Sequence, residues 1–207
     1  MIAIIDYKAG NLRSVKRALD HLGLPARITA DPVEMRAAER VIFPGVGAAR
    51  SAMESIANSG LAGVISEIVR RGVPFLGICL GAQIILSYSE EDDRTDCLDI
   101  IPGGALRFPE GPLKVPEMGW NNLKVCRDHP LFRSVDPRSQ FYFVHSYYPQ
   151  PRNDDAVVAR TEYGITFPSV IGRGNVIATQ FHPEKSGRCG LRFLREFCSW
   201  DGKDGTC

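Results

Sequence analysis

The sequence predicts an α/β fold: an open, mostly parallel, twisted sheet with helices on both faces, extended by antiparallel strands in the C-terminal half. In residues 1–90, short apolar runs alternate with segments of helical periodicity, which indicates parallel strands joined by crossover helices. The second half instead shows short strand-like segments between turn signals, a pattern typical of antiparallel hairpins. The chain has 207 residues, enough to bury one large core.

The N-terminal half supplies the parallel strands and their helices. The uninterrupted apolar run Ile2–Ile5 is typical of a central parallel strand. Leucine and valine then recur at helical spacing, and Gly23 stands where a helix C-cap favours glycine. Further strands are expected at Ala26–Thr29, at Arg40–Phe43 and just before residue 79, and helices near 48–58 and 61–71.

The C-terminal half is expected to add short strands and one closing helix. Strand-like segments lie around 105–108, 122–125, 141–147, 156–159, 166–171 and 175–181. The last helix is expected over residues 187–197. We expect one domain, residues 1–200, followed by a frayed tail, residues 201–207.

Composition and charge exclude several classes of partner. With 25 Lys and Arg against 24 Asp and Glu, the net charge is +1, so the chain carries no electrostatic footprint for nucleic acid or an anionic membrane. No apolar run approaches the length of a membrane span, and the start Met1–Asp6 lacks the basic region of a signal peptide. We therefore expect a cytoplasmic protein that binds neither nucleic acid nor membrane.

The six cysteines predict neither a metal centre nor a disulfide framework. No C-x-x-C pair occurs, and no histidine stands at metal-ligand spacing from any cysteine. A chain of this size without a secretory signal does not need disulfide staples. We expect five unpaired cysteines of structural or incidental role, no metal and no cofactor.

The remaining cysteine, Cys79, lies in the pentapeptide Gly-Ile-Cys-Leu-Gly between an apolar run and a helical segment. Gly77 and Gly81 let the backbone turn tightly, as in a nucleophile elbow with Cys in place of Ser. At the N-terminus of the following helix, the macrodipole and the unpaired N–H groups favour the reactive thiolate. The alternative is a small buried Cys at a strand–helix junction.

A histidine and a carboxylate follow a later strand, in the segment Gln180–Glu184. If this segment is extended, as Pro183 favours, His182 and Glu184 face the same side because they are two residues apart. That arrangement suits a general base whose tautomer is fixed by a carboxylate. His145, in an aromatic strand, could approach the same site, but a packed or hydrogen-bonded strand residue is the expectation.

The glycine turn Pro44–Gly47 follows the third strand and can supply an oxyanion donor. Its two glycines free the backbone and leave N–H groups uncovered by side chains. Beside an elbow, such a donor would complement the Leu80 amide. A phosphate-binding loop is disfavoured, since neither G-x-x-x-x-G-K-[ST] nor G-x-G-x-x-G occurs, while a plain tight turn stays possible.

With these motifs in place, the chain resembles the class I, triad-type glutamine amidotransferases over almost its whole length. The motifs shared with that family are Gly77–Gly81 with Gln83, and Gln180–Glu184. Stretches that narrow the match to the glutaminase subunits of imidazole glycerol phosphate synthases are Asp6–Leu12, Pro44–Ala48, Met118–Asn121 and Gln180–Ser186. Each is modest alone, and their combination in this order is specific.

The resemblance implies a glutaminase with a Cys79–His182–Glu184 triad. Cys79 would attack the side-chain amide of L-glutamine, and His182 would pass its proton to the departing ammonia. The thioester that forms would then be hydrolysed to glutamate.

The resemblance also implies the groups that hold the substrate. Oxyanions would be bound by backbone amides of Leu80 and of the turn at Val46 and Gly47. Gln83 and Glu91 match positions that the family uses to grip the amino-acid end of glutamine.

A partner is implied as well, because free ammonia would be lost to protonation and solvent. The partner would be the cyclase subunit, a (βα)8 barrel, through which ammonia reaches an N-substituted phosphoribosyl ribotide. This heterodimer would make imidazole glycerol phosphate and an aminoimidazole carboxamide ribotide in histidine biosynthesis. The residues that align with family positions near that interface are Asn11, Met118, Trp120, Tyr142 and Lys185.

Three positions depart from the family pattern: Lys8 replaces a common Gly, Ala82 a common Met, and Glu117 the usual His before Met-Gly-Trp-Asn. Because Lys8 and Glu117 fall in segments expected near the partner, a paralogue that feeds a nucleotide-sugar-modifying synthase stays an alternative. A Cys-elbow α/β-hydrolase is disfavoured, since its acid normally precedes the histidine on a separate loop. A redox-sensing relative would need the cysteine without the histidine–glutamate pair.

Overall fold

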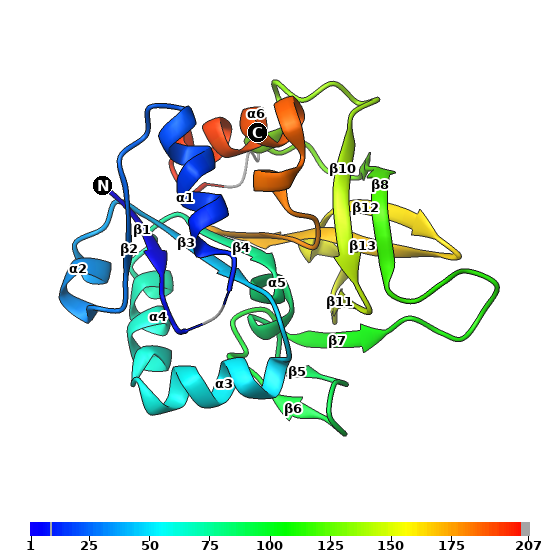
Figure 1. The fold of residues 1–207 in the computed structure, drawn as a ribbon, viewed down its shortest axis with the longest axis horizontal. Coiled ribbons are helices and arrows are strands. Elements are labelled where there is room, and N and C mark those ends of the chain that lie inside the picture. Colours follow the sequence, from blue (N-terminus) through cyan, green and yellow to red (C-terminus); the bar gives the residue numbers. More distant parts are fainter. Residues whose placement is uncertain (9, 204–207) are drawn as a thin grey trace.

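The computed structural model describes residues 1–8 and 10–203, and within them an eight-stranded sheet forms the centre (Figure 1). The strand order is β2-β1-β3-β4-β14-β13-β12-β9. The parallel strands are β1 (Ile2–Ile5), β2 (Ala26–Thr29), β3 (Arg40–Gly45), β4 (Phe75–Cys79) and β14 (Val176–Thr179). Antiparallel to their neighbours are β13 (Ile165–Arg173), β12 (Val157–Tyr163) and β9 (Lys124–Val125). The predicted sheet, mostly parallel with an antiparallel extension, is confirmed.

Helices cover both faces of this sheet, as Figure 1 shows. On one face lie α1 (Leu12–His21) and α6 (Gly187–Ser199); on the other lie α3 (Ala49–Asn58), α4 (Leu61–Arg70) and the short α5 (Leu80–Ile84), while α2 (Pro32–Arg36) packs beside α4. The strand β1 explains the two layers. Ile2 and Ile4 join the core under α1 and α6, and Ala3 and Ile5 join the opposite core, since alternate strand residues point to opposite faces.

Two smaller sheets complete the described fold, and the sequence did not predict them. The first pairs β8 (Glu117–Asn122) with β10 (Gln140–His145), and the second joins β5 (Tyr88–Ser89), β6 (Thr95–Asp96), β7 (Gly103–Arg107) and β11 (Tyr147–Pro151). The expectation of one strand over 141–147 was therefore wrong, because the chain changes sheets at Ser146. The Ser146 carbonyl accepts a hydrogen bond from the N–H of Phe108 at this crossover.

Short helical turns and the C-terminal residues finish the description. The 3-10 turns are η1 (Pro130–Phe132), η2 (Asp154–Ala156) and η3 (Pro183–Lys185). Residues 204–207 of the expected frayed tail lie outside the described residues, whereas Lys203 accepts a hydrogen bond from the Trp200 indole, 2.6 Å away. Among the described helices, none has the length and apolar character that a membrane crossing requires.

The parallel strands decide where a site can form. Because β1, β3, β4 and β14 run in the same direction, their carboxyl ends meet at one edge of the sheet. The segments that leave this edge contain Tyr7, the turn after Gly45, Cys79 and the stretch after Thr179. All of the motifs singled out around the predicted nucleophile therefore converge there.

Candidate active site

Cys79 ends β4 on a strained backbone turn at the start of α5. Its φ of 55° and ψ of −105° lie outside the regions that non-glycine residues favour. Such strain persists only where the surrounding packing enforces it. Packing here is tight, since a Cβ added at Gly81 would lie 2.0 Å from the carbonyl oxygen of Phe43. The strand–turn–helix geometry expected of an elbow is present.

The turn after β3 lies against the elbow, because Gly45 is the register partner of Cys79. A Cβ at Gly45 would come 2.0 Å from the Tyr7 hydroxyl, so only glycine is accommodated at this point. Gly47 has a φ of +101°, which strains any L side chain. The sequence signal of two glycines here thus reflects two separate demands, close approach at the first and backbone conformation at the second.

His182 reaches the same edge because β14 runs parallel to β4, with Thr179 opposite Ile78. The His182 ring is 1 % exposed, and its Nδ1 lies 2.7 Å from Oε1 of the fully buried Glu184 carboxylate. The prediction that these side chains meet is correct, and His182 itself is extended, as expected of a residue before proline. The prediction that the segment stays extended beyond His182 was wrong. Pro183 begins the 3-10 turn η3, since its fixed φ suits the first position of a helical turn.

Electrostatics in this cluster favour a charged imidazole. Burial by itself lowers the pKa of His182, but the polar contacts of the ring with Cys79 and Glu184, and then their negative charges, outweigh it and raise that pKa from 6.5 to about 10. Among the described residues, His182 Nε2 has no partner with the geometry of a hydrogen bond, so its contact with Cys79 is not fully aligned. This arrangement can hold a thiolate–imidazolium pair, with the carboxylate behind the ring.

The buried carboxylate has a second contact that the sequence did not predict. Asn11 Nδ2 donates a short hydrogen bond to the same Glu184 oxygen that faces His182. Asn11 had been assigned to the partner interface, yet its amide points at the candidate triad. Its backbone, with a φ of 72°, sits in the left-handed region that asparagine tolerates better than most residues.

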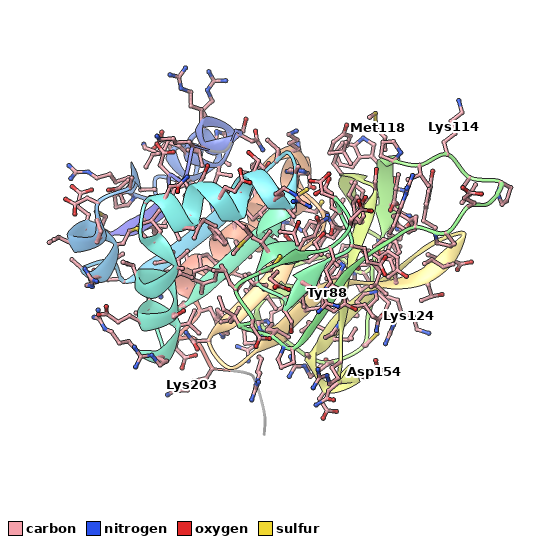
Figure 2. All side chains as sticks on the ribbon, turned by 90° about the horizontal axis from the view of Figure 1, so that it is seen from below. Tyr88, Lys114, Met118, Lys124, Asp154 and Lys203 are labelled. Carbon is pink, nitrogen blue, oxygen red and sulfur yellow. The ribbon has the colours of Figure 1, made fainter. Side chains whose placement is uncertain are left out.

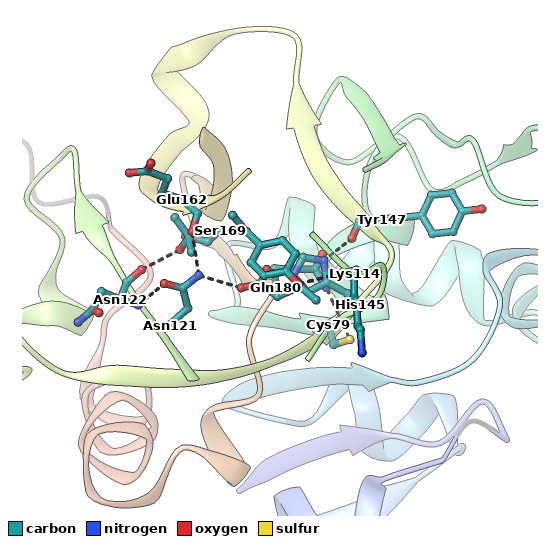
Figure 3. Close-up of polar contacts among 12 residues, drawn as sticks. Cys79, Lys114, Asn121, Asn122, His145, Tyr147, Glu162, Ser169 and Gln180 are labelled. Atoms are coloured by element: carbon teal, nitrogen blue, oxygen red, sulfur yellow. Dashed lines mark hydrogen bonds and ion pairs between the residues drawn. The ribbon is translucent and has the colours of Figure 1, made fainter. Parts of the chain in front are cut away.

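Two glutamines continue the network toward the nucleophile (Figure 3). The Gln180 amide lies 3.7 Å from the Cys79 sulfur, which it faces as a donor. Gln83 Nε2 donates to Gln180 Oε1 at 3.0 Å and to the Tyr147 carbonyl at 2.9 Å. Because both of its amide hydrogens are engaged, Gln83 offers a ligand only its oxygen. Gln180 belongs to the motif Gln180–Glu184, and its position two residues before His182 is the sequence signal that points to this role.

Glu91 lies beside the glycine turn and binds the start of a helix. Its Oε2 accepts a hydrogen bond of 2.7 Å from the Ala49 N–H, at the N-terminus of α3. A carboxylate is favoured there by the helix dipole and by the unpaired N–H groups of the first turn. The contact fixes one oxygen of Glu91 and leaves the other for the pocket.

One pocket of about 310 Å³ collects most of the predicted site residues. Those that line it are Val46, Gly47, Cys79, Leu80, Gln83, Glu91 and His182, together with the wall segment 144–147. Glu184 lies behind His182 rather than in the pocket. The volume is in the range of small-molecule sites, roughly 300–1,000 Å³, and suits a ligand of amino-acid size. The described residues contain no cluster of three or more His, Cys, Asp or Glu that could hold a metal ion.

Tyr7 is a further residue at this site that the sequence did not single out. Its side chain is 1 % exposed, and the hydroxyl has no hydrogen-bond partner among the described residues. Burial raises the pKa of Tyr7, and the negative charge of Cys79 adds to that rise. The ring packs on Phe43 at a centroid distance of 5.1 Å. Tyr7 therefore stays neutral and fills the space behind the glycine turn.

The other residues assigned to an interface form a separate exposed group on β8 and β10. Met118 and Trp120 are 65 % and 54 % exposed, unusually high for large apolar side chains. Trp120 packs edge-on against Tyr142 at 5.9 Å, and Lys185 Nζ lies 5.8 Å from the Tyr142 ring centre. Figure 2 shows Met118 and Lys114 projecting from one edge of the protein. Lys8 is exposed, whereas Ala82 and Glu117 are buried, so Glu117 does not face this surface.

Comparison with known proteins places this geometry in a family. The model of the family Glutamine amidotransferase class-I matches residues 3–199. The chain belongs to the class-I glutamine amidotransferases. The resemblance inferred from the motifs is confirmed, and the protein is a glutamine amidotransferase by family.

Curated relatives narrow the position within the glutamine amidotransferases. The Imidazole glycerol phosphate synthase subunit HisH of Moorella thermoacetica is 52% identical over 196 residues, which cover 95% of this chain and 93% of the relative. The subunit of the same name from Chloroflexus aurantiacus is 48% identical over 203 residues, 97% of this chain and 96% of the relative. The predicted membership of the HisH group is confirmed.

Solved structures agree on the fold at lower identity. A chain described as a glutamine amidotransferase superposes with a TM-score of 0.74 at 22% identity, covering 98% of this chain and 100% of the other. A chain of PurLQS from Thermotoga maritima also reaches 0.74, at 19% identity over 96% and 97% of the two chains. These likenesses concern the class I amidotransferase fold alone.

Proposed function

We propose that this amidotransferase hydrolyses L-glutamine through Cys79, His182 and Glu184. The Cys79 thiolate attacks the side-chain amide carbon, and the carbonyl becomes an oxyanion. When the C–N bond breaks, the His182 imidazolium gives its proton to the departing nitrogen, which leaves as ammonia. Water then attacks the thioester, His182 takes a proton from it, and glutamate and the Cys79 thiolate are released.

The observation that carries this proposal is that His182, backed by the buried Glu184, lines the same pocket as the strained Cys79. Cys79 and His182 reach the pocket from the carboxyl ends of adjacent parallel strands. The raised pKa of His182, about 10, means that the proton needed by the leaving nitrogen is held at neutral pH. Glu184 keeps the ring oriented through its 2.7 Å contact.

The remaining pocket residues are assigned substrate roles in the same proposal. Backbone amides of Leu80, Val46 and Gly47 form the oxyanion hole, which the glycine-rich turn beside the elbow favours. Gln83 accepts from the substrate through its free oxygen, and Glu91 attracts the α-ammonium group. A negative charge and a neutral acceptor suit the cationic end of an amino acid.

Ammonia released in this pocket is passed, in the proposal, to the cyclase subunit of imidazole glycerol phosphate synthase. The relatives named as subunits of that synthase support a heterodimer in histidine biosynthesis. We assign docking to Met118, Trp120, Tyr142 and Lys185, and the partner fold to a (βα)8 barrel. Exposed aromatic and cationic side chains of this kind are typical of interface hot spots. A cytoplasmic location suits the five described cysteines, all of which are unpaired.

The experiment compares glutamine-dependent with ammonia-dependent synthesis in the complex of this chain with a cyclase subunit. Cys79→Ala is expected to lose glutamine-dependent synthesis and to keep ammonia-dependent synthesis, because the acceptor site stays intact. A glutamine-analogue electrophile should label Cys79 in the wild type, and an ester substrate should not. Glutamine-driven turnover by Cys79→Ala would refute the mechanism.

A further inference from the structure

A second buried histidine–glutamate pair lies beside the pocket, and the proposed triad does not use it. His145 stands directly opposite Glu117 in the β10–β8 pair. Their side chains are 2 % and 3 % exposed, and His145 Nε2 lies 3.0 Å from Glu117 Oε2. Burying an ionisable pair costs free energy that must be offset by well-placed contacts.

On the histidine side, the ring is tied to the main chain of the pocket wall. His145 Nδ1 lies 2.8 Å from the carbonyl oxygen of Tyr147, and a carbonyl can only accept, so Nδ1 carries the hydrogen. The other nitrogen, Nε2, faces Glu117 Oε2 at 3.0 Å, in a contact that is not aligned as a hydrogen bond. Glu117 is held in turn by Asn121 Nδ2, which donates to its Oε1 at 2.9 Å. The ring is thus fixed from both sides.

On the Tyr147 side, the same carbonyl is an anchor for the substrate pocket. It accepts a second hydrogen bond from Gln83 Nε2, whose other partner, Gln180, faces the Cys79 sulfur. Figure 3 shows His145, Tyr147, Gln180 and Cys79 as neighbours in this network. The Tyr147 carbonyl therefore connects the buried His145–Glu117 pair to Gln83, which lines the pocket.

The wall that carries this carbonyl lies at the junction of two strand pairs, since His145 pairs with Glu117 in β8 and Tyr147 pairs with Arg107 in β7. Residues 144–147 line the pocket, and the chain leaves one sheet and enters another at Ser146. Ser146 has no register partner in either strand pair, so contacts outside the strand pairing contribute to the position of the wall at this residue. The bond from His145 to Tyr147 spans the crossover, with one further bond from Phe108 to Ser146.

We infer that Glu117 and His145 are a positioning pair for glutamine binding. Glu117 orients His145, His145 holds the Tyr147 carbonyl, and that carbonyl holds the Gln83 amide with its free oxygen toward the substrate. The inference rests on the proposed function, and it concerns substrate binding rather than chemistry. Neither residue touches the reacting atoms.

The test measures glutamine hydrolysis by the full chain in complex with a cyclase subunit, over a range of glutamine concentrations. His145→Ala and Glu117→Ala are expected to raise KM for glutamine about tenfold and to change kcat less than about threefold, the signature of lost ground-state binding. His145→Asn keeps a donor near the Nδ1 position, and Glu117→Gln keeps an acceptor. These two conservative variants are expected to restore KM to within about threefold of wild type.

A matched control separates positioning from stability. Asn175 donates hydrogen bonds of 3.1 and 2.7 Å to Val69 and Val73 at the far end of β14, away from the pocket. Asn175→Ala should lower the melting temperature as the test variants do, with KM unchanged. Active sites are counted in every preparation by labelling Cys79 with a glutamine-analogue electrophile, so that misfolded protein does not enter kcat.

The possible outcomes distinguish this inference from the proposed function. If the wild-type complex hydrolyses no glutamine, the proposed function fails first. If the wild type is active and KM stays within twofold of wild type in both His145→Ala and Glu117→Ala, the positioning role is overturned. An equal rise in KM for Asn175→Ala would also overturn it, because the effect would then be general instability.

Discussion

Two clusters in this protein are built from the same three kinds of side chain and differ in what the second nitrogen of the histidine ring faces. In each, a buried histidine faces a buried glutamate, and an asparagine amide donates to that glutamate: His182 with Glu184 and Asn11, and His145 with Glu117 and Asn121. In the first cluster, the free ring nitrogen lies in the field of Cys79. In the second cluster, one ring nitrogen faces the glutamate and the other, Nδ1, donates a hydrogen bond to the main-chain carbonyl of Tyr147.

A buried histidine–carboxylate pair is therefore not by itself evidence of a catalytic role. What the second ring nitrogen faces decides the role, since a base must reach a proton that moves in the reaction. The nucleophile at the strained turn is what distinguishes the clusters. The following variants test that distinction, beginning with the largest expected effect.

Exchanging the two histidines in turn should separate the clusters most sharply. His182→Asn is expected to lower kcat for glutamine by about 10³-fold, because proton transfer by a positioned base contributes roughly 10²–10⁴-fold. His145→Asn should lower kcat/KM by less than about tenfold, since only ligand binding is affected. Steady-state hydrolysis in the cyclase complex checks both. Comparable losses of kcat in the two variants would contradict the assignment.

Variants of the two carboxylates should also differ, with the larger loss of activity at Glu184, although the difference should be smaller than that between the two histidine variants. Glu184→Gln keeps the shape but removes the charge that orients and stabilises the imidazolium, and kcat should fall by about 10²-fold. Glu117→Gln should change kcat/KM only about threefold. The measurement is again steady-state hydrolysis, with Cys79 labelling as the count of folded sites. A larger effect at Glu117 than at Glu184 would reverse the comparison.

The titration of His182, in the first cluster, should make the free energy of unfolding depend on pH. Because the folded state raises the pKa of His182 from 6.5 to about 10, the folded chain keeps a proton that the unfolded chain loses in this window. The stabilisation is complete below pH 6.5 and is lost as pH rises toward 10, with a slope of at most about 1.4 kcal/mol per pH unit.

Urea unfolding at several pH values measures this effect. The wild type should lose stability relative to His182→Asn as pH rises, and Cys79→Ala should show a shallower loss because one negative partner of His182 is gone. A wild-type slope equal to that of His182→Asn would show that His182 does not titrate in this window.

The two asparagines should give the smallest effects and a final distinction. Each variant, Asn11→Ala and Asn121→Ala, removes one hydrogen bond to a buried carboxylate and should cost about 2 kcal/mol of unfolding free energy. Only Asn11→Ala should also lower kcat, by several-fold, through Glu184. Urea denaturation and kcat measured together check this pair. A loss of kcat in Asn121→Ala but not in Asn11→Ala would contradict the proposal that the cluster of His182 and Glu184 is the catalytic one.

Much of the first cluster could be predicted from the sequence, because its residues lie in short motifs whose members are close together in the chain. A cysteine between two glycines at a strand–helix junction specifies an elbow, and two residues that are only two apart in His182-Pro-Glu184 are bound to lie near each other. Even here the reasoning was partly wrong, since Pro183 starts a 3-10 turn and does not extend the chain. His182 and Glu184 are nevertheless in contact, because two residues so close in the chain can adopt few arrangements that keep their side chains apart.

The second cluster was not available, because its members meet only through strand pairing. The sequence predicts Glu117 only as a departure from the family pattern near the partner surface, and His145 as a packed or hydrogen-bonded strand residue. The register of β8 against β10 places them opposite each other, and β8 was not predicted as a strand. Asn11 was likewise missed as a contact of Glu184, since 173 residues separate the two in the chain.

By itself, the sequence determined the sheet and its two helical layers, the elbow and the family, because these follow from local periodicity, glycine placement and motif order. Tertiary structure alone decided which polar groups became neighbours. The ends of the parallel strands brought Cys79, His182 and Gln180 together, and the crossover at Ser146 brought His145 to Tyr147. Contacts between distant segments depend on register and on the sheet to which a strand belongs. Neither is written in the composition of any one segment.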